Sequence, residues 1–295
     1  MDTNQAEAYV SFNEVQKSYD GENLVVKDLN LGVQRGEFMT MLGPSGSGKT
    51  TCLMMLAGFE TATSGEIMLD GTAINNVPPW KRDIGIVFQN YALFPHMTVR
   101  ENLAYPLEVR KMPKSEIDER VKKALAMVQL EGFSGRRPGQ LSGGQQQRVA
   151  VARALVFEPK LVLMDEPLAS LDEQHKKEIL PFLELLHREL EIPMIYVSHS
   201  IDEVAQLADH LILLDEGRVV GHGEISEMLT RLDLSLSRGE RAASIIEATV
   251  SSHDEDYNLT AIDFSGGRFF VPRKQLSIGC EVRLRIEARD VSLTT

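Results

Sequence analysis

The chain has 295 residues, of which 43% are hydrophobic and 25% charged, an ordinary balance for a globular protein. This length is enough for one large domain and a second, smaller one. Asp and Glu (43) outnumber Lys and Arg (31), and the resulting net charge of -12 argues against broad, sequence-independent binding of nucleic acid, which needs a basic surface.

The two cysteines, Cys52 and Cys280, lie far apart and have no metal-ligand spacing, which favours a reducing compartment. The first ten residues have neither the basic segment nor the apolar segment of a signal peptide. No apolar stretch approaches the roughly 18 residues that span a bilayer. We therefore expect a soluble, cytoplasmic protein that can still bind a membrane partner.

The first third of the chain alternates polar and apolar residues in a pattern that predicts strands. The expected strands cover residues 9–15, 24–33, 38–43, 65–71 and 83–89. The stretch 38–43 is mostly apolar and ends in glycine, which is typical of a buried strand that leads into a loop.

Helical spacing appears next, at residues 116–128, with Ser115 as the expected N-cap. The rest of this region alternates between the two patterns: strands at 161–166 and 194–200, helices at 178–190 and 201–207, and a hairpin at 210–223 that turns at Glu216-Gly217. Pro181 is expected in the first turn of its helix, where proline is tolerated.

Strands that alternate with helices predict an α/β fold with a largely parallel sheet in a three-layer core. From residue 244 onward the chain has only short alternating segments, which predict a small antiparallel β barrel or sandwich. These segments cover residues 245–250, 258–264, 268–272 and 281–288. We therefore expect one domain at 1–231, a linker at 232–241, and a small all-β domain at 242–295.

The strongest motif follows the expected strand 38–43 and precedes a helical pattern. It consists of Gly43, Pro44, Ser45, Gly46, Ser47, Gly48, Lys49 and Thr50, and matches the phosphate-binding loop GxxxxGK[ST]. In such a loop Lys49 contacts the β- and γ-phosphates of ATP and the Thr50 hydroxyl binds Mg²⁺. We include the next residue, Thr51, in the nucleotide-binding group.

A second motif, Asp165-Glu166, ends the apolar strand 161–166. A buried strand that ends in acids can deliver a carboxylate to Mg²⁺, and Asp165 is the expected metal partner. Glu166 can then act as the general base on the attacking water. The pair has little weight alone but gains weight from the phosphate loop.

A third motif identifies a family resemblance. Leu141, Ser142, Gly143, Gly144 and Gln145 read LSGGQ, and the chain from about residue 9 to 223 resembles the ATPases of the ATP-binding cassette (ABC) family, P-loop NTPases with antiparallel β and helical subdomains. In this family two cassettes pair head to tail, with each ATP between the phosphate loop of one and the signature motif of the other. The resemblance thus implies a homodimer with two shared sites.

The resemblance assigns roles to further positions. Tyr19 matches the aromatic that stacks on adenine, although a plain strand-edge tyrosine is an alternative. Gln89 looks like the glutamine that approaches Mg²⁺ and the attacking water. Asp172 belongs to a segment, Ser170-Leu171-Asp172, that looks like the dimer-contact loop. His199 looks like the histidine that contacts the γ-phosphate.

The single cassette resembles importer ATPases, which implies membrane permease subunits, a substrate-binding protein reached through them, and a place at the cytoplasmic face of the cell membrane. The family resemblance places permease docking at residues 89–102. There Tyr91, Leu93 and Phe94 are candidates for exposed apolar contacts, with packing inside the protein as the alternative. The short aromatic and basic stretch Trp80-Lys81-Arg82 is expected to face solvent.

The transported substrate is ambiguous, because the two halves of the chain resemble different importers. The sequence up to about residue 167 resembles polyamine (spermidine/putrescine) importer ATPases, and the remainder resembles molybdate importer ATPases with the start of an oxyanion-binding β module. Because the docking region lies in the first half, we favour polyamine import, with molybdate import as the alternative. A soluble non-transport ABC ATPase is a third, weaker hypothesis, and the net charge argues against a nucleic-acid partner.

Overall fold

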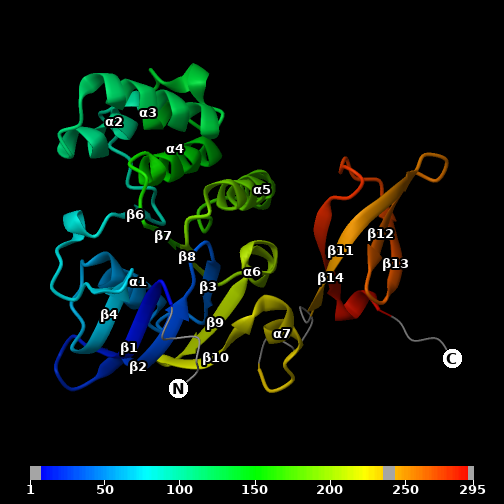
Figure 1. Ribbon diagram of the computed structural model, residues 1–295, viewed down its shortest axis with the longest axis horizontal. Coiled ribbons are helices and arrows are strands. Elements are labelled where there is room, and N and C mark those ends of the chain that lie inside the picture. Colours follow the sequence, from blue (N-terminus) through cyan, green and yellow to red (C-terminus); the bar gives the residue numbers. More distant parts are fainter. Residues whose placement is uncertain (1–7, 235–242, 292–295) are drawn as a thin grey trace. The chain divides into compact units, whose positions relative to one another are not determined.

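The computed structural model describes residues 8–234 and 243–291 (Figure 1). Its contacts divide the chain into two compact units, Met1–His222 and Gly223–Thr295, and each is described by itself. The sequence placed the end of the first domain later, after residue 231. Most of the expected linker, from residue 235 to 241, lies outside the described residues.

The first unit is built on a six-stranded sheet in the order β10-β9-β3-β8-β7-β6. The four inner strands and β6 are parallel, and β10 returns through the expected turn at Glu216-Gly217, where both residues have positive φ. The strands are β3 (Phe38–Leu42), β6 (Ile84–Val87), β7 (Leu161–Asp165), β8 (Met194–Ser198), β9 (His210–Asp215) and β10 (Arg218–Glu224).

A second sheet in this unit is antiparallel, in the order β2-β1-β4-β5. Its strands are β1 (Val10–Ser18), β2 (Leu24–Val33), β4 (Ser64–Leu69) and β5 (Thr72–Ala73). The apolar residues of β1, β2 and β4 share one buried cluster with α1 (Lys49–Ala57) and one face of the six-stranded sheet. This sheet therefore forms an outer layer of the core.

The central strands are apolar on both faces, as the sequence predicted. In β8, Ile195 and Val197 pack with the antiparallel sheet, whereas Met194 and Tyr196 pack against helices on the other side. These helices are α4 (Gly143–Leu155), α5 (Glu173–Leu190) and α6 (Ile201–Leu207). The expected three-layer, largely parallel core is confirmed.

A helical subdomain gathers α2 (Val99–Val109), α3 (Lys114–Met127) and one face of α4 around a third apolar cluster (Figure 1). Three short 3₁₀ turns complete the unit: Pro79–Lys81, Glu131–Phe133 and Pro138–Gln140. In the part of the chain that the structure describes, no helix has the length and apolar character needed to cross a membrane.

Two helix starts differ from the sequence predictions. Helix α3 begins at Lys114, because the carbonyl of Pro113 already accepts the N–H of Ile117 at 3.0 Å, so Ser115 is not the N-cap. Helix α5 begins at Glu173, because Asp172 caps it by accepting the N–H of His175 at 2.9 Å. Pro181 therefore lies inside α5 and not in its first turn.

The second unit contains α7 (Ile225–Thr230), which the sequence did not predict, and a four-stranded antiparallel sheet in the order β13-β12-β11-β14. The strands are β11 (Ala243–Asp254), β12 (Leu259–Phe264), β13 (Gly267–Pro272) and β14 (Glu281–Glu287), followed by a 3₁₀ turn at Ala288–Asp290. The expected all-β character of this region is confirmed, with α7 packed beside β11.

Candidate active site

The predicted site residues of four parallel strands meet at one edge of the central sheet. Leu42 in β3 pairs with Ser198 in β8, and Asp165 in β7 pairs with Val197. Strand β6 ends beside β7, where Val87 pairs with Met164. The carboxyl ends of these strands are therefore level, and the loops that follow them carry the expected phosphate loop, acids, histidine and glutamine.

The phosphate loop leaves β3 at Gly43. A Cβ atom at this position would lie 2.1 Å from the carbonyl oxygen of Leu214. Only glycine, which has no Cβ, lets the backbone pass this close to Leu214. The loop ends at Gly48, the left-handed N-cap of α1. A helix N-terminus reached through glycines favours a bound anion such as phosphate.

Lys49 is buried within this loop. Its ammonium donates to the carbonyl oxygens of Gly43 at 2.7 Å and Pro44 at 2.8 Å, and to the Ser47 hydroxyl oxygen at 3.4 Å. Burial lowers the pKa of Lys49, against the attraction of two nearby carboxylates. An added anion stabilises a buried ammonium of this kind, because burial has removed most of its water.

Thr50 and Asp165 form the candidate metal site. The Thr50 hydroxyl donates to a carboxylate oxygen of Asp165 at 3.0 Å. Burial raises the pKa of Asp165, and this hydrogen bond opposes the shift. A hydroxyl and a carboxylate are the hard oxygen donors that Mg²⁺ prefers. Among the described residues no cluster of three His, Cys, Asp or Glu side chains could hold a metal.

Glu166 and His199 lie next to this pair. Glu166 has a left-handed φ of 44°, and its backbone N–H donates to the carbonyl oxygen of Val197 at 3.1 Å. Its carboxylate is 3.6 Å from Nδ1 of His199, whose side chain is 61% exposed. A carboxylate and an imidazole thus meet at the carboxyl edge of the sheet, and both are groups that can hold or exchange a proton with water.

Gln89 and Tyr19 lie at the ends of strands and face solvent. Gln89 is exposed and follows β6 by two residues. Tyr19 follows β1, is 59% exposed, and has the ammonium of Lys17 at 4.7 Å from its ring centroid. Both positions are compatible with the predicted contacts, and their roles stay predictions.

The signature motif begins α4. The Ser142 hydroxyl accepts the N–H of Gln145 at 3.3 Å, and the Gln145 side chain accepts the N–H of Ser142 at 3.1 Å, which makes a capping box. A Cβ atom on Gly143 would lie 3.0 Å from Leu171, the middle residue of the expected dimer-contact loop. Asp172 ends that loop as the cap of α5, so both loops are anchored at helix N-termini.

The expected docking segment is more buried than predicted. Tyr91 is buried, and its hydroxyl lies 2.7 Å from the Ser170 hydroxyl, so the expectation of an exposed Tyr91 is wrong. Leu93 and Phe94 are half-buried. The guanidinium of Arg153 donates to the carbonyl oxygens of Tyr91 at 2.9 Å and Ala92 at 2.8 Å, and so anchors this loop by its backbone.

The stretch Trp80-Lys81-Arg82 does not wholly face solvent. Trp80 and Lys81 are exposed, but Arg82 is buried. Its guanidinium donates to the carbonyl oxygens of Met55 and Leu56, both at 2.8 Å, at the C-terminal end of α1. A cation at this end offsets the negative pole of the helix that carries Lys49. The prediction for Arg82 is therefore wrong.

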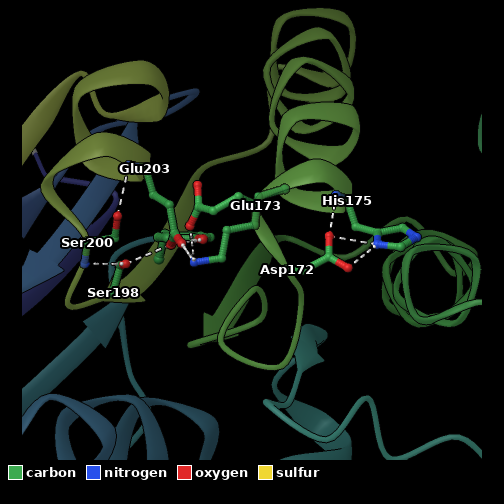
Figure 2. A network of polar contacts seen from close by, with 8 residues as sticks. Asp172, Glu173, His175, Ser198, Ser200 and Glu203 are labelled. Carbon is green, nitrogen blue, oxygen red and sulfur yellow. Dashed lines mark hydrogen bonds and ion pairs between the residues drawn. The ribbon is translucent and has the colours of Figure 1, made fainter.

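Sequence reasoning missed a buried network beside His199 (Figure 2). The carboxylate of Glu203 accepts from Tyr196 and Ser198 and pairs with Lys176 of α5. Ser200 and Glu203 have the S-x-x-E spacing of a capping box, which would have pointed to this glutamate. Its carboxylate, however, turns inward to β8.

Comparisons with known proteins identify the family of this chain. Residues 26–169 match the ABC transporter family. The molybdenum import ATP-binding protein ModC of Pseudomonas syringae pv. tomato is 48% identical over 261 residues, covering 86% of this chain and 72% of that protein. The spermidine/putrescine import ATP-binding protein PotA of Clostridium novyi is 40% identical over 289 residues, covering 98% of this chain and 81% of that protein.

Solved structures give the same result. The chain is similar to cbiO1 of Clostridium perfringens, described as part of the ABC transporter complex cbiONQ, with a TM-score of 0.71, 32% identity, and 76% of this chain and 92% of that one covered. It is also similar to the cassette MJ0796 in a dimeric, post-hydrolysis state bound to ADP and Pi, with a TM-score of 0.65, 34% identity, and 73% and 98% covered. This chain belongs to the ABC transporter family, as an ATP-hydrolysing subunit built on the ABC cassette.

Proposed function

We propose that this chain is the ATPase subunit of an importer of molybdate or a related tetrahedral oxyanion. Three relatives named for molybdenum import are 44–48% identical to it, against 40% for the relative named for spermidine/putrescine import. The comparisons therefore favour the alternative of the sequence analysis over its preference for polyamine. The cassette itself contacts ATP and the permease, so the substrate assignment rests on this similarity.

The ATPase function rests on one observation: Lys49, Asp165, Glu166 and His199 gather at the carboxyl edge of one sheet. In the proposed reaction Lys49 binds phosphate oxygens. Glu166 holds the attacking water and takes its proton, and His199, 3.6 Å from that carboxylate, orients the γ-phosphate. Gln89, on the loop after β6, contributes a further polar contact to the water.

Mg²⁺ is the proposed metal, held by the Thr50 hydroxyl and the Asp165 carboxylate, with Gln89 as a further proposed contact. When bound, it neutralises charge that develops on the phosphates. The raised pKa of Asp165 fits this role, because a carboxylate that is costly to ionise alone gains most from a cation. Tyr19 is the proposed support for adenine, and Thr51 completes the nucleotide-binding set.

The active form is proposed to be a homodimer in which Ser142, Gly143, Gly144 and Gln145 of one chain face the phosphate loop of the other. Within one chain the signature glycines lie against Leu171, on the loop that leads into α5, and His175, in the first turn of α5. Membrane permease subunits would bind at the loop after β6, and a substrate-binding protein would act through them. These partners place the chain at the cytoplasmic face of the membrane.

The proposal is tested in membrane vesicles that contain this chain with a molybdate-type or a polyamine-type permease, each with its loaded binding protein. We expect ATP hydrolysis to be stimulated by the molybdate set only. Stimulation by the polyamine set alone would overturn the substrate assignment and restore the polyamine hypothesis. Absence of ATP hydrolysis in every combination would overturn the ATPase assignment.

We also propose that the all-β region, residues 242–295, is a small regulatory domain that senses transported oxyanion. Relatives named for molybdenum import match the chain over up to 286 residues, and the relative named for spermidine/putrescine import matches it over 289. The similarity to importer ATPases therefore extends into this region, and the sensed oxyanion rests on the substrate assignment proposed above. The test measures ATP hydrolysis by the full chain against molybdate concentration, and by a chain without residues 244–295. Equal responses of the two forms would contradict a regulatory role.

A further inference from the structure

Glu203 is a buried carboxylate in the first turn of α6 that the proposed reaction does not use. One of its oxygens accepts from the Tyr196 hydroxyl and from the Ser198 hydroxyl, both at 2.7 Å. The other lies 3.0 Å from the ammonium of Lys176. A buried charge is tolerated when it is both paired and hydrogen-bonded, and Glu203 meets both conditions.

The hydrogen bonds of Glu203 hold the residues on both sides of His199. The Ser198 hydroxyl donates to Glu203 and also accepts the backbone N–H of Ser200 at 3.0 Å (Figure 2). The N–H of Glu203 in turn donates to the Ser200 hydroxyl at 3.5 Å. These hydrogen bonds fix the backbone of the turn that carries His199. The imidazole itself stays exposed and lies beside Glu166.

The other end of the network reaches the dimer-contact loop. Lys176 lies one turn into α5, and its backbone N–H donates to the carbonyl oxygen of Asp172 at 3.0 Å. The Asp172 carboxylate also lies 2.9 Å from Nδ1 of His175 (Figure 2). The ion pair between Lys176 and Glu203 therefore joins the start of α5 to the turn after β8.

We infer that Glu203 is a positioning residue for His199, and that Lys176 is its counter-ion and couples it to the dimer-contact loop. This inference rests on the proposed ATPase function. Glu203 needs no contact with nucleotide in this role, because it acts through Ser198 and Ser200. Loss of its charge lets the turn relax, so the imidazole spends less time where it can meet the γ-phosphate.

The test compares kcat and ATP affinity in the full chain. Glu203→Gln is expected to lower kcat by about 10-fold with the Kd for ATP within about 2-fold, because the phosphate loop is untouched. In a His199→Ala background the same change is expected to lower kcat by less than about 2-fold, since both act on one step. Ser198→Ala, which keeps the ion pair, is a milder second variant and is expected to lower kcat by about 3-fold.

The matched control is Glu184→Gln, which removes an exposed ion pair with Arg188, at 3.0 Å, on α5, the helix of Lys176. It is expected to leave kcat unchanged. Lys176→Met alone should lower kcat more than the double variant Lys176→Met with Glu203→Gln. The single change leaves the buried Glu203 carboxylate without a counter-ion, whereas the double variant removes both charges.

Wild-type kcat in both Glu203→Gln and Ser198→Ala would overturn the inference. A fall in kcat for Glu203→Gln that is as large in the His199→Ala background as in the unmodified chain would also overturn it, since the change would then act independently of His199. If the unmodified chain and Glu184→Gln fail to hydrolyse ATP, the proposed function fails first and the inference fails with it.

Discussion

The two edges of the central sheet use polar residues in opposite ways. At the amino edge two carboxylates have fixed protein partners: Glu37 lies 2.8 Å from Nδ1 of His210, and Asp209 accepts the N–H of Phe38 at 2.9 Å. At the carboxyl edge, burial raises the pKa of Asp165 and lowers that of Lys49, and Glu166 has a positive φ. The polar contacts at the amino edge stabilise the fold. At the carboxyl edge the protein keeps charged groups that are costly to bury and a strained backbone residue, and both suit a ligand-binding site.

The largest expected effect is at the carboxyl edge. Glu166→Gln removes the proposed base but keeps the shape of the side chain, so kcat should fall by about 100-fold or more while ATP binding is retained. Steady-state hydrolysis and equilibrium binding of ATP measure the two quantities. Hydrolysis at the normal rate would reject the role of Glu166 as base.

The amino edge should give the opposite result. His210→Ala leaves the buried Glu37 carboxylate without its imidazole partner and should lower the free energy of unfolding by about 2 kcal/mol, with kcat unchanged. Denaturant unfolding and ATP hydrolysis measure both. His222→Ala, at an exposed position on β10, is the matched control and should alter neither. A large fall in kcat for His210→Ala would remove the contrast between the edges.

Asp165→Asn should show that the carboxyl edge costs stability. The pKa of Asp165 is raised in the fold, so stability is lost as the pH rises from its ordinary 3.8 through the raised value. The amide cannot ionise, so without nucleotide the variant should melt about 2 °C higher at pH 7. This gain should shrink toward pH 4. Thermal unfolding against pH measures it, and a lower Tm at pH 7 would contradict the argument.

The smallest effect is expected at Tyr91. Tyr91→Phe removes the hydrogen bond to Ser170 and should cost about 1 kcal/mol, with hydrolysis by the isolated chain within about 2-fold. Unfolding by denaturant gives the stability. A selective loss of permease-stimulated hydrolysis, with stability unchanged, would instead assign Tyr91 to the docking surface.

Much of the fold follows from local pattern. The strands that became β3, β7 and β8 are apolar runs with clear ends, and β2 shows the alternating pattern of a half-buried strand. The phosphate loop was recognised from the fixed spacing of its glycines, Lys49 and Thr50. The site could be predicted where chemistry and sequence position coincide, as in Asp165-Glu166 at a strand end. The predicted start of α5 was wrong because Asp172 was assigned to a loop, although aspartate is a favoured N-cap residue.

Side-chain contacts between segments that are distant in the chain could not be predicted from the sequence. Arg82 lies in an exposed stretch, but its guanidinium reaches the end of α1, and nothing in its neighbours indicates this. Tyr91 looked like a surface aromatic because its partner, Ser170, lies far along the chain. Glu203 and Lys176 lie on different helices and meet only when α5 and α6 pack together. Such pairs depend on the topology of the sheet and not on any local period.

The anchoring of the loop after β6 has a consequence for how such proteins diverge. Arg153 binds the carbonyl oxygens of Tyr91 and Ala92, groups that every amino acid supplies. Exposed side chains of this loop, such as His96, can therefore be exchanged while the loop keeps its attachment. If the permease docks at this loop, as proposed above, a lineage can change the surface for a new membrane partner while Arg153 keeps the loop attached.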